Sequence, residues 1–510
     1  MSRFKKILSL FFFDKNEKKF IKYFTNINNR KSYKLKKKKI LVSVIDDYYW
    51  LCRVASAKHN EFKNYELIGY WPQIIKPRNK ADNQLLYFLK NILRPINYFF
   101  IRKKWFYLYK KIGITKIITP EYLNKKYGKE INYNKIENKF IRLKKKIKTK
   151  KDIHQIKINN YYYGDLIYDS YLRYRNLPTV NLNDKYLDYI IYNTIKYIDI
   201  FEKYSKNIDI FFSIYSTYVE FGLPVRVFLK NKKKVITDGN NQYFKVLTKK
   251  DWSHVENYSN FRKDFKKIKD KQNCINISKK IIKNYFFNQN NKSSIYSYLN
   301  KNFFTNKKNS KIKNLDGVIF LPNFFEAQRE WGKILFNDFY EWIFFTIDLL
   351  KKANLKFMIK PHPNINTINK ESKIVVEEIK LRYPEIKWLS SNESNYKIFK
   401  SVKFGISMWG SVLWELAYFK KIAIACGNHP GKNYNFIFTP RNIKEFEKLV
   451  FNINKIKNKR YKIEEIYEYI YMFMLKNNDA FINNARNLNL KKIHWQNSDS
   501  LDIFLKKYSS

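Results

Sequence analysis

The sequence predicts an α/β protein with two Rossmann-like, doubly wound domains. Its 510 residues are too many for one ordinary domain. Short apolar, β-branched runs alternate with helical stretches, which is typical of parallel βαβ units. A polar stretch without periodicity, near residues 301–315, separates two such patterns, and the second begins at Gly317. We therefore expect one domain on each side of this stretch.

The first pattern is expected to form an N-terminal domain over residues 37–305. Its apolar runs predict strands at 40–45, 65–71, 114–118, 208–214 and 234–237, with helices between them. Residues 1–36 form a basic leader in front of it. The apolar run in this leader, residues 7–13, is too short to span a bilayer and no cleavage site follows it. The leader is expected to be flexible or packed, and contact with a membrane surface is an alternative.

The second pattern predicts a C-terminal domain over residues 312–455. Strands are expected at 317–321, 356–359, 386–389, 402–407 and 422–426. Residues 456–510 are expected to be helical and to return toward the first domain.

The chain is strongly basic, with 101 Lys and Arg against 44 Asp and Glu and a net charge of +57. The lysines are spread along the whole sequence, which favours solvated surfaces over a nucleic-acid groove. Attraction to anionic lipid or to an anionic substrate is a third interpretation. Three separated cysteines offer no disulfide framework and fit a reducing cytoplasm. We expect a cytoplasmic protein, with peripheral contact at the inner membrane face left open.

A first motif is Lys360-Pro-His362-Pro, at the end of the strand predicted for 356–359. In open α/β sheets, ligands bind at the carboxyl ends of strands. There His362 can donate to a phosphate oxygen and Lys360 can add positive charge. A tight turn with no ligand is the alternative for this motif.

A second motif runs from Ser407 to Glu415, where a strand, a glycine turn and a helix follow one another. The start of a helix offers free N–H groups and suits a phosphate, and the hydroxyls of Ser407 and Ser411 add donors beside Gly410. Glu415 lies one turn beyond Ser411 and could accept from the hydroxyls of a ribose. The alternative is that Ser411 only caps the helix and Glu415 only stabilises its first turn.

Together these motifs resemble the bacterial capsule polysaccharide biosynthesis glycosyltransferases, with Kdo and sialic acid transferases that carry a His-Pro loop as more distant relatives. The resemblance covers roughly residues 160–450 and includes a Phe-Leu-Pro-Asn-Phe-Phe-Glu segment that ends at Glu326. It also includes Gly-Asp-Leu-Ile-Tyr-Asp at 164–169 and Gly-Leu-Pro-Val-Arg-Val at 222–227. The resemblance implies a GT-B fold, in which two such domains face an interdomain cleft. The C-terminal domain would then bind a nucleotide-sugar donor, CMP- or UDP-linked, and the N-terminal domain a glycan or lipid-linked glycan acceptor.

An inverting transfer requires a base, for which the candidates are Asp46, Asp47, Glu326 and His362. The expected donor-binding residues are Lys360, His362, Ser407, Gly410, Ser411 and Glu415, and the expected acceptor-binding residues are Asp165, Asp169, Arg173 and Tyr218. A structural ion-pair network is the alternative for Asp165, Asp169 and Arg173. The resemblance places histidines after the strand at 208–214 and after Leu321, where this chain has Tyr-Ser-Thr and Pro-Asn.

The sequence predicts no cofactor and no metal site, because no Asp-x-Asp or paired Cys and His ligands lie near the expected donor phosphate. The remaining histidines are expected to be structural or to lie on the surface. Alternatives for the whole chain are a CDP-glycerol-type polyol-phosphate transferase, an inactive scaffold in a polysaccharide assembly and a basic nucleic-acid-binding protein, although no nucleic-acid partner is expected.

Overall fold

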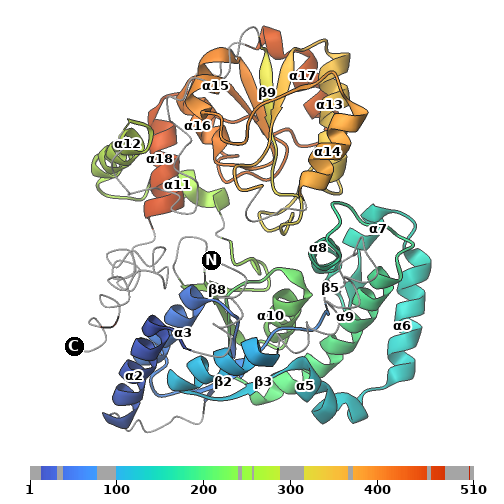
Figure 1. Cartoon of the computed structure of the whole chain (residues 1–510), viewed down its shortest axis with the longest axis vertical. Coiled ribbons are helices and arrows are strands. Elements are labelled where there is room, and N and C mark those ends of the chain that lie inside the picture. Colours follow the sequence, from blue (N-terminus) through green and yellow to red (C-terminus); the bar gives the residue numbers. More distant parts are fainter. Residues whose placement is uncertain are drawn as a thin grey trace.

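The protein folds into two α/β domains that lie one above the other along its long axis (Figure 1). This computed structural model describes residues 13–30, 38–76, 99–238, 244–255, 258–287, 315–365, 372–456, 461–476 and 505. The N-terminal domain contains a six-stranded sheet and the C-terminal domain a five-stranded sheet. The predicted fold class, with two doubly wound domains, is confirmed.

The N-terminal sheet has the strand order β3-β2-β1-β6-β7-β8. Its strands are β1 (Lys39–Ser43), β2 (Glu66–Tyr70), β3 (Ile114–Ile118), β6 (Ile210–Ser213), β7 (Lys234–Asp238) and β8 (Phe244–Leu247). All neighbours are parallel except β7 and β8. The central strand β1 is fully buried from Ile40 to Val42 because helices cover both faces of the sheet.

The helices of the N-terminal domain are α2 (Lys15–Arg30), α3 (Tyr48–Asn60), α5 (Pro120–Tyr127), α6 (Tyr133–Lys146), α7 (Lys150–His154), α8 (Gly164–Arg175), α9 (Lys185–Tyr204) and α10 (Leu223–Lys230). Five of them, α3, α5, α6, α7 and α9, begin at a residue whose side chain caps the helix. Thr119 caps α5 and Pro120 occupies its first turn, which explains why β3 ends at Ile118. A short hairpin of β4 (Lys157–Ile158) and β5 (Tyr161–Tyr162) precedes α8.

The C-terminal sheet is parallel throughout, with the order β11-β10-β9-β12-β13. Its strands are β9 (Gly317–Phe320), β10 (Phe357–Lys360), β11 (Lys387–Trp388), β12 (Phe404–Ser407) and β13 (Ile422–Ala425). Its helices are α13 (Phe339–Lys352), α14 (Ser372–Arg382), α15 (Asn395–Ser401), α16 (Val412–Tyr418) and α17 (Ile443–Phe451). Gly317 lies under the ring of Phe404, where a Cβ atom would approach that ring to 2.2 Å.

The chain leaves the N-terminal domain earlier than the expected break at 301–315, which lies outside the described residues. Helices α11 (Phe261–Phe265) and α12 (Lys271–Phe287) share a hydrophobic core with the C-terminal domain and with α18 (Glu464–Ile470). Figure 1 shows α11, α12 and α18 together beside the upper domain. These helices belong to the C-terminal domain because of hydrophobic packing: Phe286 of α12 contacts Trp414 and Tyr418 of that domain.

Both ends of the described chain contribute to the N-terminal domain. Phe20 and Phe24 of α2 are fully buried in its core, so this part of the leader is packed. Leu505 belongs to the same core and is 4 % exposed. Beyond α18, therefore, the chain comes back to the first domain at this residue. Among the described residues, no helix is both long and apolar enough to cross a membrane.

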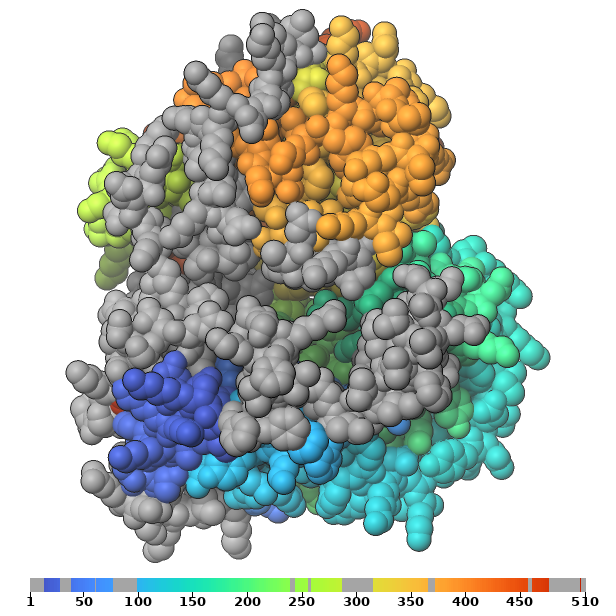
Figure 2. All heavy atoms as spheres, viewed as in Figure 1, coloured from blue at the N-terminus to red at the C-terminus, as the bar shows by residue number. Residues whose placement is uncertain are grey.

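Polar contacts join the two domains beside α7 and α8. Asp338 caps α13, and its second carboxylate oxygen accepts hydrogen bonds from Tyr168 at 2.6 Å and Thr179 at 2.5 Å. Lys150 forms a salt bridge of 2.9 Å with Glu341. Figure 2 shows the blue-green part of the N-terminal domain touching the orange part of the C-terminal domain. These contacts fix one side of the interdomain boundary.

Candidate functional site

The loops that carry most of the predicted site residues follow parallel strands. Parallel strands place their carboxyl ends at one edge of a sheet, so the loops after β1 and β6 are neighbours. The loop after the central strand β9 lies between the loops after β10 and β12 for the same reason. Predicted site residues that are far apart in the sequence therefore lie together in a small number of clusters.

One cluster combines Asp169, Arg173 and Tyr218 of the N-terminal domain with Glu326 of the C-terminal domain. Burial raises the pKa of Tyr218; the charge of Arg173 opposes this rise, whereas those of Asp169 and Glu326 add to it. Burial also raises the pKa of Glu326 to about 7, although Asn323 donates a hydrogen bond of 2.7 Å to it and Arg173 lies close enough to lower it. The cluster therefore spans the interdomain cleft.

The members of this cross-cleft cluster differ in accessibility. Asp169 is 3 % exposed, and burial raises its pKa to about 7 despite the guanidinium of Arg329, 3.8 Å away. Arg173 is exposed and forms no hydrogen bond or salt bridge with the described residues. Tyr218 has a left-handed backbone with φ of 56°, which is strained for an aromatic residue and is most often retained at functional sites.

Asp165 lies one helical turn from Asp169, and Arg226 holds its carboxylate in an ion pair. Arg226 donates two hydrogen bonds to its carboxylate, at 2.7 and 2.5 Å. Burial alone would raise the pKa of Asp165, but the charge and hydrogen bonds of Arg226 outweigh it and lower the pKa. Packing also restricts the start of this helix, because a Cβ at Gly164 would meet the carbonyl oxygen of Ile153 at 2.0 Å.

Asp46 and Asp47 follow β1, at the carboxyl edge of the N-terminal sheet. Asp47 caps α3, since its carboxylate accepts from the backbone N–H of Trp50 at 2.8 Å. Asp46 is exposed. Burial raises the pKa of Tyr215. The charge of Asp47 adds to this rise and the charge of Arg173 opposes it, so both residues lie near this tyrosine. Both aspartates therefore lie toward the cleft, and their catalytic role stays a prediction.

Three of the expected donor-binding residues share one buried hydrogen-bonded network, which we call the Glu415 network. Glu415 is 2 % exposed and accepts from Ser411 at 3.3 Å and from Tyr285 at 2.9 Å through one oxygen. Its other oxygen accepts from Asn395 at 3.1 Å, and Asn395 in turn accepts from Lys360 at 2.5 Å. Burial lowers the pKa of Lys360 to about 8, which the charge of Glu415 partly offsets.

Ser407 and Gly410 have local roles in holding the loops after β12 and β13. The hydroxyl of Ser407 donates to the carbonyl of Phe320 at 3.0 Å and ties β12 to β9. His429 hydrogen-bonds to the backbone of Gly410 and accepts from the N–H of Gly431 at 2.8 Å. His429 is 1 % exposed, and burial lowers its pKa to about 3. This histidine is structural, as the sequence predicts.

His362 lies partly buried in the loop after β10. The backbone N–H of Asn364 donates to its Nδ1 at 3.2 Å. Burial, with the charge of Lys360, lowers the pKa of His362 to about 4, so the ring is neutral at pH 7 and carries its proton on Nε2. It can therefore donate one hydrogen bond. Its convergence with Ser411 on a donor phosphate stays a prediction.

Two histidines that the sequence predicts to be structural or on the surface connect the domains. His254 is 2 % exposed; its Nδ1 lies 2.9 Å from Ser216 Oγ, and its Nε2 lies 3.3 Å from Glu330 of the C-terminal domain. His154 lies 2.7 Å from Arg329, and burial lowers its pKa to about 3. Ser216 stands in the loop where the resemblance places a histidine, so His254 reaches that loop from another segment.

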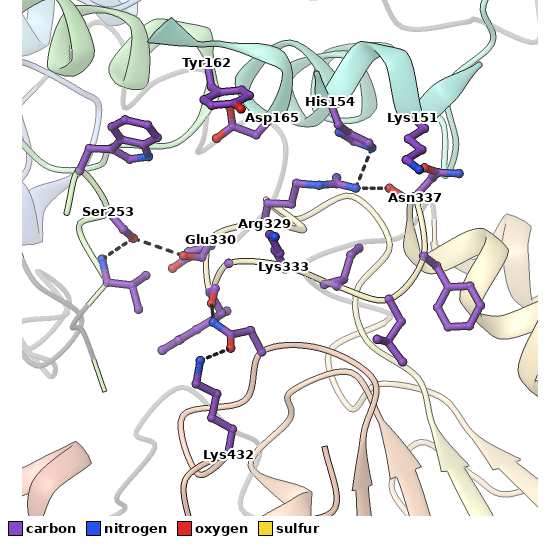
Figure 3. A pocket seen from close by; sticks show the side chains of 18 of the residues that line it. Lys151, His154, Tyr162, Asp165, Ser253, Arg329, Glu330, Lys333, Asn337 and Lys432 are labelled. Carbon is purple, nitrogen blue, oxygen red and sulfur yellow. Dashed lines mark hydrogen bonds between the residues drawn. The ribbon is translucent and has the colours of Figure 1, made fainter. Parts of the chain in front are cut away.

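An interdomain cavity of about 980 Å³ lies between the two domains. Figure 3 shows Tyr162 and His154 on one wall, Lys432 on the opposite wall, and Arg329 and Lys333 between them. Asp165 lines this cavity, whereas the other predicted site residues do not. Within the described part of the chain, no group of three or more His, Cys, Asp and Glu is placed to hold a metal ion.

Comparison with known proteins gives no family assignment. No family model matches the chain, and no curated protein sequence matches it. Among solved structures it is similar to a glycosyltransferase from Rickettsia africae, at 13 % identity, with 90 % of this chain and 100 % of that chain covered and a TM-score of 0.27. It is similar to the UDP-GlcNAc 2-epimerase of Methanocaldococcus jannaschii at 9 % identity, with coverages of 85 % and 98 % and a TM-score of 0.26. The wall teichoic acid polymerase TagF follows at 11 % identity, with coverages of 95 % and 99 % and a TM-score of 0.23. At these values the similarities do not assign an activity.

Proposed function

We propose that this protein is a glycosyltransferase that moves a sugar from a nucleotide-activated donor to a bacterial capsular or other surface polysaccharide. The observation that carries the proposal is Glu326, a carboxyl group with a pKa of about 7 at the end of the central strand β9, opposite Arg173 and Tyr218. A general base works best when its pKa lies near the working pH. The position after a central parallel strand is also where α/β sheets bind ligands.

Glu326 is better suited to the role of base than Asp169. Both carboxyl groups have a pKa of about 7. Asp169, however, is 3 % exposed and faces Arg329, so an acceptor hydroxyl would need to displace that arginine. Glu326 is only partly buried, and the single hydrogen bond that it accepts from Asn323 leaves lone pairs free for an incoming hydroxyl.

The transfer itself is a substitution at the anomeric carbon of the donor sugar. Glu326 takes the proton of the acceptor hydroxyl as its oxygen forms the new bond to that carbon. The bond between the carbon and the phosphate oxygen breaks, and the nucleotide leaves with the electron pair. Arg173 and Tyr218 would position the acceptor, since the guanidinium has no partner in the described chain.

The donor phosphates would lie at the loops after β10 and β12 of the C-terminal domain. His362 offers an Nε2–H donor there, and a neutral donor can stabilise the charge that develops on the leaving phosphate. The Glu415 network would support this site through Lys360 and Ser411. We propose transfer without a metal ion or cofactor. The net charge of +57 suits a lipid-linked acceptor at an anionic membrane surface, with the protein on its cytoplasmic side.

The test uses the full chain and two separate measurements. Thermal shift with CMP, UDP and GDP should show stabilisation by one nucleotide, because a ligand that binds the native state raises its stability. Transfer from the matching labelled nucleotide sugars to oligosaccharide acceptors should then release that nucleotide. Transfer of labelled phosphorus to the acceptor would instead identify a polyol-phosphate transferase. Binding of nucleic acid in place of all nucleotides would contradict the proposal.

A further inference from the structure

The interdomain cavity is formed by segments far apart in the chain. Its walls come from α7 to α8, from residues 251–259, and from residues 329–337 after β9. A second cavity of about 860 Å³ shares Lys333 and Lys432 with it and continues along the C-terminal domain past Arg441. The two cavities thus form one extended groove, which suits a chain-like ligand better than a compact one.

Every acidic side chain that lines the interdomain cavity already has a cationic or hydrogen-bonding partner. Asp165 is held by Arg226, and Glu341 by Lys150 at 2.9 Å. Asp251 forms a salt bridge of 2.8 Å with Lys245. Glu330 lies 3.3 Å from His254 Nε2, as described above. The field of Asp165, Glu341 and Asp251 inside the cavity is therefore largely cancelled at short range, and that of Glu330 remains.

The lysines that line the cavity, unlike most of its carboxylates, have no partner of opposite charge among the described residues. Lys151, Lys333 and Lys432 line it, and none forms a salt bridge with the described residues. Lys432 donates only to the neutral side chain of Asn428, at 2.8 Å. Arg329, on the same wall, forms a salt bridge of 3.8 Å with Asp169, and its backbone N–H donates to the other oxygen of that carboxylate at 3.5 Å. The net uncompensated charge of the cavity is positive.

Aromatic side chains line the cavity beside these cations. Trp252 and Trp331 are partly buried, and Tyr162 is 39 % exposed. The guanidinium of Arg226 lies 4.9 Å from the ring centre of Trp252 and holds that indole in place. Rigid aromatic faces beside polar groups are well suited to the C–H faces and hydroxyls of sugar rings.

We propose that the interdomain cavity and its extension bind the saccharide chain beyond the acceptor hydroxyl that Arg173 and Tyr218 position, and that this saccharide is anionic, with carboxylate or phosphate groups on its sugar rings. Glu330, which lines the cavity, follows Glu326 by four residues, so the cavity adjoins the proposed base. The assignment rests on the proposed glycosyltransferase function. Lys151, Lys333 and Lys432 bind the anionic groups, and Trp252 and Trp331 stack on the sugar rings. A neutral glycan would leave these lysines without partners and gain only the stacking contacts.

The test is calorimetric titration of the full chain with tetragalacturonate and with uncharged maltotetraose. Tetragalacturonate should bind at least about tenfold more tightly, and the difference should shrink as salt is added. In Lys333→Gln/Lys432→Gln, the affinity for tetragalacturonate should fall by about tenfold or more, because each lost contact is a charge pair in a partly desolvated groove. The same titration with a sugar phosphate distinguishes phosphate from carboxylate as the preferred group.

The matched control is Lys129→Gln/Lys373→Gln, which removes the same charge from exposed positions outside the cavity. An equal loss in this control would show that the net charge alone attracts the ligand, and would overturn the proposal. Equal binding of maltotetraose, or no binding of any anionic saccharide, would also overturn it. If Lys333→Gln/Lys432→Gln weakens nucleotide binding instead, the cavity holds the donor and the acceptor assignment is wrong. A chain that binds tetragalacturonate through these lysines but transfers no sugar would contradict only the proposed function.

Discussion

Arg226 holds the carboxylate of Asp165 with two parallel hydrogen bonds, of 2.7 and 2.5 Å, across 61 positions of the sequence. Asp165 opens α8, and Arg226 lies on α10. The pair therefore joins the two N-terminal segments on which the family resemblance depends. At Gly222, between them, a Cβ atom would meet Leu166 at 2.4 Å, so these helices approach as closely as they can.

The first prediction concerns the stability of this pair. Asp165→Asn should lower the free energy of unfolding by about 2–3 kcal/mol, because it leaves the buried guanidinium of Arg226 without its countercharge. Urea denaturation followed by tryptophan fluorescence measures the change. Asp188→Asn is the matched control: Asp188 pairs with Lys144 and is 31 % exposed, against 32 % for Asp165. That control should cost less than about 1 kcal/mol, and equal losses would show that the buried arginine is unimportant.

The second prediction is the pH dependence of transfer. With Glu326 as base and a pKa of about 7, kcat/KM should rise about tenfold per pH unit below pH 7 and level off above it, since only the ionised form accepts a proton. Glu326→Gln should lower turnover by about 10²-fold or more and remove this dependence. Glu377→Gln, at an exposed position on α14, should leave both unchanged. A pH profile that survives in Glu326→Gln would assign the base elsewhere, first to Asp169.

The third prediction separates the two nitrogens of His362. His362→Ala should lower turnover by about 10²-fold or more, as expected for the loss of one charge-stabilising donor. His362→Gln can place an amide N–H where Nε2 lies and should retain more activity. His362→Asn keeps an acceptor for the N–H of Asn364 but loses the distal donor, and should resemble alanine. Equal activity of the asparagine and glutamine variants would exclude a role for Nε2.

The fourth prediction is that Glu415 contributes to folding. A ribose-binding carboxylate predicts that Glu415→Gln weakens nucleotide binding more than folding. In the structure, however, Tyr285, Ser411 and Asn395 all donate to this carboxylate. We therefore expect Glu415→Gln to lower the free energy of unfolding by roughly 1–3 kcal/mol. Tyr285→Phe, which removes one donor and no charge, should cost less. A variant that folds normally but no longer binds nucleotide would restore the ribose role.

The fifth prediction uses the buried His429. Its pKa is about 3 in the folded protein and about 6.5 in the unfolded chain, so the unfolded chain binds more protons below pH 6.5. Stability is consequently lost as the pH falls from 6.5 toward 3, by about 2 kcal/mol at pH 5 for this one group. His429→Gln should show a flatter decline between pH 7 and 5 than the unmodified protein, measured by urea denaturation at each pH. If the stability of the variant and of the unmodified protein declines in parallel, the protons taken up on unfolding bind to groups other than His429.

Much of the fold could be predicted because buried parallel strands are continuous apolar runs. The strand at 114–118 has the predicted bounds, and those of β1 and β9 are close to the predicted ones. β8 was harder to recognise because it lies at the sheet edge and exposes Val246. α15 has only seven residues, which are too few to reveal a helical period in the sequence.

The site was less predictable because its contacts cross between domains. The sequence groups Asp169, Arg173 and Tyr218 as acceptor-binding residues, but nothing in it indicates that Glu326 of the other domain lies beside them. His254 is a single histidine in a loop, and only the fold brings it to Ser216, 38 positions away. For Asp165 the sequence left two interpretations open, acceptor binding and a structural ion pair; the structure shows the ion pair with Arg226, and the acceptor role stays a prediction.

The path of the chain determines how the two domains can move. It passes from the N-terminal core to the C-terminal core between Leu247 and Val255, and it has returned to the N-terminal core at Leu505. Two bodies joined at one point can swivel freely, whereas two connections define an axis between them. The domains should therefore open and close by rotation about the axis that runs through these two connections. Cleavage of the chain at either connection should remove this constraint and allow rotation in other directions.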